Sequence, residues 1–139
     1  MKINISKKIM YLALLSGLVC FVISGCDLVS ASVSNLQVGT EVDETSKEVI
    51  NSQDTLDSRS PYLYASIFVK NAPEDTRLRA TWTYKDRQIA KPSEIDVSGS
   101  RYIAFSSRRP IEGFRTGDYK ITVEIIDSDE KIEKTFSVI

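Results

Sequence analysis

Apolar and polar residues alternate strictly in the middle of the chain, and this alternation predicts a β-strand. Between residues 78 and 85, apolar side chains occupy every second position and polar or charged side chains the positions between. A period of two over eight residues is typical of a strand with one buried and one hydrated face. We therefore expect Trp82 and its neighbour Tyr84 to point into a core. A ligand cleft is the alternative for these two aromatic residues.

Similar patterns recur on both sides of this strand. Residues 62–70 are dense in aromatic and β-branched residues, and the Asn, Pro and Asp of residues 71–75 are typical of a turn. Phe114 is expected to plug the core from a loop at 108–116. Further strands are predicted at 33–42, from Ile89, at 95–97, 102–106, 117–125 and 132–138, with a turn at 98–100 and a loop at 45–60 that could include one short strand. Seven or eight short strands without a helical period predict an antiparallel β-sandwich.

The first 25 residues have the layout of a secretory signal peptide. Three lysines precede 15 uncharged residues, Ile9 to Ile23, and small residues follow. As a helix this stretch would reach about 22 Å, short of the roughly 30 Å of a bilayer core, although a permanent transmembrane helix is the alternative. The predicted organisation is a cleaved signal peptide at 1–25, a tether at 26–32 and one domain at 33–139.

The end of this segment resembles a known processing motif. Ile23-Ser24-Gly25-Cys26 resembles the lipobox of bacterial lipoproteins, in which an aliphatic residue and two small residues precede the modified cysteine. The resemblance implies that diacylglycerol is attached to Cys26 and that the chain is cut just before it, so that membrane lipid is one partner. It also implies a place in the bacterial cell envelope, on the outer face of the cytoplasmic membrane or on the outer membrane.

A second resemblance concerns the domain itself. The segment from Val33 to Ile139 resembles the immunoglobulin-like superfamily, in which a core tryptophan lies in a central strand, as Trp82 does here. Gly117-Asp118-Tyr119-Lys120-Ile121 is similar to the late Gly-x-Tyr-x-Cys stretch of these domains, which implies a tyrosine corner at Tyr119. Ile121 stands where such domains have their second cysteine, so hydrophobic packing would replace their disulfide. The resemblance extends to domains of poorly characterised bacterial lipoproteins and implies no agreed activity.

The composition narrows the possible chemistry. The chain contains no His, which excludes Ser-His-Asp hydrolases, Cys-His proteases and His-based zinc sites. Its two cysteines cannot form a four-thiolate zinc site, and there is no glycine-rich phosphate loop. From Cys26 onward, 15 basic residues face 19 acidic ones, whereas a nucleic-acid binder should present a basic face. We expect no cofactor, no metal, no nucleic-acid partner and no enzymatic activity.

One local concentration of positive charge stands out. Arg101, Arg108, Arg109 and Arg115 are interrupted by a single acidic residue, Glu112. Guanidinium groups bind carboxylates and phosphates through paired hydrogen bonds, so these arginines are candidate contacts for an anionic partner: lipid headgroups, an acidic glycan or a protein. The alternative is a solvated loop whose arginines pair with Glu112 and Asp118, each pair contributing about 0–1 kcal/mol.

These observations favour a membrane-anchored lipoprotein whose immunoglobulin-like domain is a non-catalytic binding or envelope-accessory module, with a protein or glycan partner in the cell envelope. Two alternatives remain open. The domain could act as an anchored inhibitor or chaperone-like cap that uses an exposed edge strand. It could also be a hydrolase that uses carboxylates, since these side chains are present.

Overall fold

The computed structural model describes residues 30–139, which form an all-β domain without helices. The predicted signal peptide and Cys26 lie outside the described residues. Within them, no helix could cross a membrane. The strands are β1 (Ser32–Gly39), β2 (Glu41–Val42), β3 (Val49–Ile50), β4 (Thr55–Leu56), β5 (Tyr62–Tyr84), β6 (Arg87–Gln88), β7 (Ser93–Arg108), β8 (Gly117–Ile125) and β9 (Lys131–Val138).

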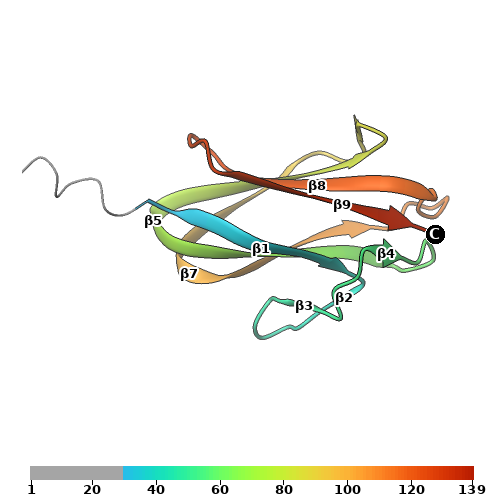
Figure 1. Cartoon of the computed structure of the whole chain (residues 1–139), viewed down its shortest axis with the longest axis horizontal. Coiled ribbons are helices and arrows are strands. Elements are labelled where there is room, and N and C mark those ends of the chain that lie inside the picture. The colour runs from blue at the N-terminus through green and yellow to red at the C-terminus, as the bar shows by residue number, and fades with distance from the viewer. Residues whose placement is uncertain (1–29) are drawn as a thin grey trace, which may run out of the picture. The chain divides into compact units, whose positions relative to one another are not determined.

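Seven of these strands form a single sheet. Its central order is β1-β5-β8-β9-β4, and both β6 and β7 pair with β5. All pairings are antiparallel except that of β4 with β9. β2 and β3 form a separate two-stranded ribbon. Figure 1 shows β5 and β7 running together along most of the domain.

β5 and β7 are two halves of one long, bent hairpin. Tyr62–Val69 of β5 pairs with the second half of β7, and Thr76–Ala80 pairs with its first half. The other edge of β5 pairs with β1 along its first half and with β8 along its second half. One strand therefore belongs to both faces of the fold. The result is a nearly closed, barrel-like sheet, where the sequence predicted a sandwich of seven or eight strands.

The predicted turns at 71–75 and 98–100 are wrong, because the chain does not reverse there. Both segments remain in strands, and the pairing of β5 with β7 shifts register on either side of Ala72. Asn71 and Asp75 adopt positive φ angles of 55° and 69°, and Gly99, opposite Ala72, has a φ of 76°. Such irregularities bend and twist a paired ribbon without breaking it. The residues that predicted turns therefore bend the paired strands β5 and β7.

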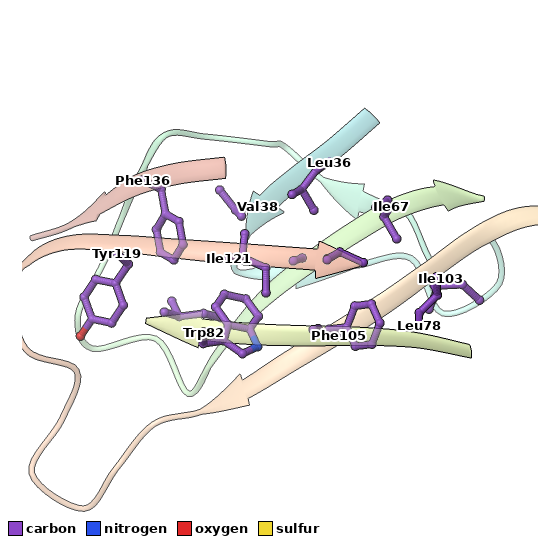
Figure 2. Close-up of a cluster of buried hydrophobic side chains, with 14 of the residues drawn as sticks. Leu36, Val38, Ile67, Leu78, Trp82, Ile103, Phe105, Tyr119, Ile121 and Phe136 are labelled. Carbon is purple, nitrogen blue, oxygen red and sulfur yellow. The ribbon is translucent and has the colours of Figure 1, made fainter. Parts of the chain in front are cut away.

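The core fills the space enclosed by the bent sheet, as Figure 2 shows. Every second residue of β8, and of the segments 63–69 and 78–82 of β5, contributes to it, as the alternation predicted, and Trp82 is 3% exposed. Its ring packs edge-on against Phe136, with centroids 6.1 Å apart, so Trp82 lies in the core and not in a cleft. The indole Nε1 of Trp82 has no hydrogen-bond partner among the described residues. Phe114 is buried, as predicted.

Tyr119 fastens the loop before β8 to the core. Its ring lies between Tyr84 and Phe136, at centroid distances of 4.9 and 5.6 Å. Its hydroxyl donates a hydrogen bond of 2.8 Å to the carbonyl of Arg115, four residues upstream. Burial raises the pKa of the Tyr119 hydroxyl. The raised pKa favours the protonated hydroxyl, and only this form can donate the hydrogen bond that holds the 109–116 loop in place.

We expect Tyr119→Phe to lower the free energy of unfolding near neutral pH by about 0.5–1.5 kcal/mol, the usual contribution of one hydrogen bond. Because the pKa of Tyr119 is raised on folding, the wild type should lose stability as pH rises above the unfolded value of about 10, where only the unfolded tyrosine ionises. The difference in unfolding free energy between wild type and variant should then become smaller. Urea unfolding at pH 8 and above pH 10, followed by Trp82 fluorescence, measures this difference. An equal difference at both pH values would contradict this account.

Candidate binding site

Two loops meet at one end of the domain. Residues 85–92 connect β5 to β7 and include β6, and residues 109–116 connect β7 to β8. The pairing of Tyr84 with Tyr119 brings the two loops together. β1 begins at the opposite end, where Ser32 pairs with Lys70 beside the bend (Figure 1). The nine residues of β8 span about 30 Å between the two ends.

These two loops are basic. Together with Arg108 at the end of β7, they carry six cationic residues and two acidic ones, Asp86 and Glu112. The cations are Lys85, Arg87, Lys91, Arg108, Arg109 and Arg115. The described domain as a whole has 15 basic and 18 acidic residues, so the positive charge is local. Across residues 30–139, none of the six forms an ion pair with a carboxylate.

A groove of about 690 Å³ opens between the two loops, and we call it the basic groove. Lys85, Arg87 and Arg115 supply its positive charge, and Ile89 and the buried Phe114 supply apolar surface. The remaining lining residues are Tyr84, Pro110, Glu112, Gly113 and Tyr119. Next to it, Ile111 is fully exposed at the tip of the second loop. The arrangement combines unneutralised cations with apolar surface, and so suits a ligand that is both acidic and apolar.

Tyr84 is part of the groove but is already engaged by its neighbours. Its hydroxyl donates a 2.9 Å hydrogen bond to the carbonyl of Thr116, and the Lys85 ammonium lies 5.3 Å from its ring centroid. A Cβ on Gly117, whose φ is 132°, would approach the Tyr84 ring to 3.2 Å. A glycine is therefore required where β8 begins. Since Tyr119 also packs on this ring, Tyr84 offers little free surface for a sugar to stack on.

The four arginines singled out from the sequence do not form one cluster. Arg115 lines the basic groove, Arg108 is the last residue of β7, and Arg109 begins the loop that contains Arg115. The Arg109 amide donates to the carbonyl of Pro61 at 2.9 Å, and its guanidinium donates to the carbonyl of Arg59. Arg101 lies about 23 Å from Arg108 along β7 and lines a different groove.

The alternative pairing of these arginines with Glu112 and Asp118 does not form within residues 30–139. Asp118 instead accepts a hydrogen bond of 3.1 Å from the hydroxyl of Ser137. Sequence reasoning missed Lys85 and Arg87 as members of the site. They lie 30 and 28 residues before Arg115 in the chain, and only the pairing of β5 with β8 brings them near it. The available signal was the end of the alternating pattern at Lys85, which marked a loop.

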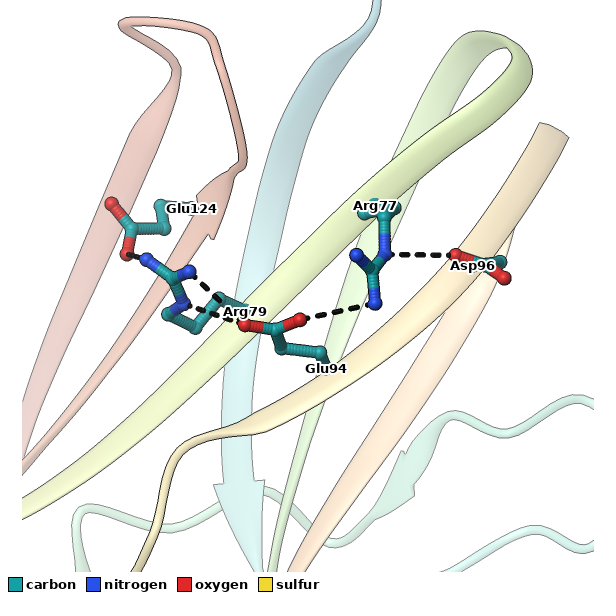
Figure 3. A network of polar contacts seen from close by, with 5 residues as sticks. All are labelled: Arg77, Arg79, Glu94, Asp96 and Glu124. Atoms are coloured by element: carbon teal, nitrogen blue, oxygen red, sulfur yellow. Dashed lines mark hydrogen bonds and ion pairs between the residues drawn. The ribbon is translucent and has the colours of Figure 1, made fainter.

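A second charged cluster on the sheet surface is fully paired (Figure 3). Arg79 contacts Glu94 at 3.0 Å and Glu124 at 3.4 Å, and Arg77 contacts Glu94 at 3.1 Å and Asp96 at 3.2 Å. The hydrogen bonds from Arg79 to Glu94 raise the pKa of the guanidinium further. These contacts connect β5, β7 and β8, so this cluster stabilises the sheet and leaves little charge for a ligand. No set of three metal-ligating side chains gathers in the part of the chain that the structure describes.

Comparison with known proteins gives only a loose structural likeness. No protein-family model matches the chain, and no curated protein matches it. Among solved structures, it is similar to part of the β-glucosidase EmGH1 of Erythrobacter marinus, at 11% identity and a TM-score of 0.48, over 79% of this chain and 15% of that one. It is also similar to part of a β-glucosidase of Listeria innocua, at 9% identity and a TM-score of 0.45, over 78% of this chain and 16% of that one. Neither likeness bears on function.

The basic groove should tolerate loss of its charges without loss of stability. We expect the double variant Arg87→Gln, Arg115→Gln to unfold within about 0.5 kcal/mol of wild type, because neither side chain has an ion-pair partner in the described domain. The matched control Arg79→Gln breaks a half-exposed network and should cost up to about 1 kcal/mol. Urea unfolding measures both. A larger loss in the double variant than in the control would mean that the groove arginines are structural.

Proposed function

We propose that this chain is a bacterial lipoprotein of the cell envelope, anchored through acylated Cys26, whose domain is a non-catalytic binding module. Its binding site is the basic groove, and its ligand is an acidic segment of another envelope protein. One observation carries this proposal: Lys85, Arg87 and Arg115, which have no carboxylate partner in the described domain, line a groove that also offers apolar surface, on a domain that is acidic as a whole. Guanidinium groups in such a setting favour binding of carboxylates.

The position of the groove supports a partner that approaches from the aqueous compartment. Five residues separate Cys26 from Ser32, the first residue of β1, which allows at most about 20 Å of extended chain. The groove lies about 30 Å further along, at the other end of the strands. A partner protein can reach that end more readily than can the headgroups of the membrane that holds the anchor.

The chemistry of the groove favours a polypeptide over a glycan. Sugar-binding sites commonly offer an aromatic face, and here the Tyr84 ring is engaged by Tyr119 and Lys85. Ile89 is 40% exposed beside the cations, and an apolar side chain of a ligand could cover it. A segment that alternates acidic and apolar residues would satisfy both kinds of surface.

We also propose that the fold is immunoglobulin-like, which suits a binding role. The strand neighbours support this: β1, the first half of β5 and the second half of β7 lie together, as do the other halves with β8 and β9. The hydrogen bond from the Tyr119 hydroxyl to the Arg115 carbonyl has the form of a tyrosine corner. Trp82 in the core of β5 is consistent with the same family.

The anchor can be tested by mass. We expect the wild-type protein from membranes to lack residues 1–25 and to carry diacylglycerol on Cys26. Cys26→Ser should retain all 139 residues and incorporate no labelled palmitate, because the hydroxyl replaces the thiol that the lipid requires. Intact-protein mass spectrometry measures both. A wild-type chain that keeps its first 25 residues, or a variant processed like wild type, would contradict the proposal.

The ligand class can be tested with defined probes on the full chain in detergent micelles. We expect a fluorescent ten-residue peptide of alternating Glu and Leu to bind, and its affinity to fall at least tenfold in the variant Lys85→Gln, Arg87→Gln, Arg115→Gln. The cause is the loss of three charge-assisted contacts, so salt should weaken binding to the wild type more than to the variant. Fluorescence anisotropy at two salt concentrations measures this.

Two controls make the result decisive. The variant Arg77→Gln, Arg79→Gln, Lys131→Gln removes the same number of charges away from the groove and should bind the peptide as wild type does. Polygalacturonate serves as the acidic-glycan probe. If the glycan binds through the groove and the peptide does not, or if both triple variants weaken the peptide equally, the proposed ligand class is wrong.

A further inference from the structure

The long strand β7 has a free edge. Among residues 30–139 its only partner strand is β5, although β7 runs for 16 residues. Its second half, Arg101–Arg108, contains no Pro and no Lys, and its register against Tyr62–Val69 is unbroken. Proteins normally protect exposed strand edges with Pro or Lys residues, with β-bulges or with a covering element. An unprotected edge of this length can accept another strand.

The register identifies which backbone groups face outward. The Arg109 amide donates to the carbonyl of Pro61, which makes these two a hydrogen-bonded pair. In an antiparallel ladder such pairs alternate, so Ser107, Phe105 and Ile103 also bond to β5. The amides and carbonyls of Tyr102, Ala104 and Ser106 therefore point away from β5. They form an outward row of donors and acceptors with Ala104 at its centre.

A groove runs along this same edge. Its volume is about 530 Å³, and it is lined by six consecutive residues, Arg101–Ser106. Successive side chains of a strand point to opposite faces, so a groove that touches all six follows the edge and not one face. Its far wall is the turn between β2 and β3, residues 44–47. The space beside the outward row is therefore open to an extended chain.

The positive charges at the two ends of this edge favour a partner strand with acidic residues opposite them. Arg101 and Arg108 are exposed and form no ion pair within the described domain, and the six residues between them are uncharged. The outward groups belong to even-numbered residues, so two copies pairing antiparallel about the middle of this edge would set Ala104 opposite Ala104. Arg101 of each copy would then lie opposite Ser107 and diagonal to Arg109 of the other, with no acidic residue of the edge facing it, so self-pairing leaves the arginine charges uncompensated. Acidic residues opposite these positions would instead be favourable.

We propose that the Arg101–Arg108 edge of β7 binds an extended segment of a partner protein as an added antiparallel strand. The segment carries acidic residues seven positions apart, opposite Arg101 and Arg108, and uncharged residues between them. Seven is an odd number, so the two arginines leave opposite faces of β7, and the two acidic side chains follow the same alternation. This surface is separate from the basic groove and does not depend on the function proposed for that groove.

The probe is an acetylated and amidated eight-residue peptide with Glu at both ends and alternating Thr and Val between them. On the full chain in micelles, we expect it to bind at least tenfold more tightly than the same peptide with Lys at both ends. Fluorescence anisotropy measures the affinity. In amide hydrogen exchange by NMR, Tyr102, Ala104 and Ser106 should become protected on binding. Ile103 and Phe105, already bonded to β5, should change little.

Two sets of variants test the mechanism. Ala104→Pro removes the central outward N–H without touching a bond to β5, and should weaken the Glu-flanked peptide at least tenfold. Its matched control Ala104→Ser keeps the N–H and should bind as wild type does. The variant Arg101→Glu, Arg108→Glu keeps the backbone and should reverse the preference, so that the Lys-flanked peptide binds more tightly. Trp82 fluorescence verifies that each variant is folded.

Several results would overturn the proposal. These are no binding of the Glu-flanked peptide to folded wild type, no reversal in the Glu variant, or equal binding by the Pro and Ser variants. Protection of the same three amides by raising the protein concentration alone would identify a second copy as the occupant. Loss of binding in the variant Lys85→Gln, Arg87→Gln, Arg115→Gln would place the peptide in the basic groove instead.

Discussion

The backbone ladder between β5 and β7 is the interaction on which the rest of the structure depends. It continues from Tyr62 to Ala80 on one strand and from Ser93 to Arg108 on the other, and it survives a sharp bend between its halves. Because the bend keeps the ladder intact, one hairpin supplies both sides of the core. β1 and β8 then add to different halves of the same β5 edge. The enclosed core follows from this one bent pairing.

The same ladder explains where the two binding surfaces lie. Closing the hairpin at residues 85–92 puts Lys85 and Arg87 at the end where β8 begins, next to Arg115. Using one edge of β7 for β5 leaves its other edge without a strand in the described domain. The paired network of Arg77, Arg79 and their acidic partners lies on neither surface. Charges that stabilise the sheet and charges available to a ligand are therefore separated in space.

Local pattern predicted the strands and the core well. The inward positions of β8 and the burial of Trp82 follow from alternation, since a pleated strand sends every second side chain to the same face. The two bends could not be predicted in this way. Asn, Asp and Gly tolerate positive φ angles in a reversing turn and in a bulged strand alike, so residues 71–75 and 98–100 carry the same local signal for both.

The sequence by itself determined which residues are buried, which are charged and where strands begin, because these depend on neighbours within a few positions. Only the tertiary structure decided which charges meet. In the fold, Lys85 and Arg87 lie beside Arg115 in one groove, whereas Arg101 lines another. Within the described domain, the arginines form no ion pair with the alternative partners Glu112 and Asp118. Contacts between distant strands depend on pairing register, and a register is set by the packing of the whole core.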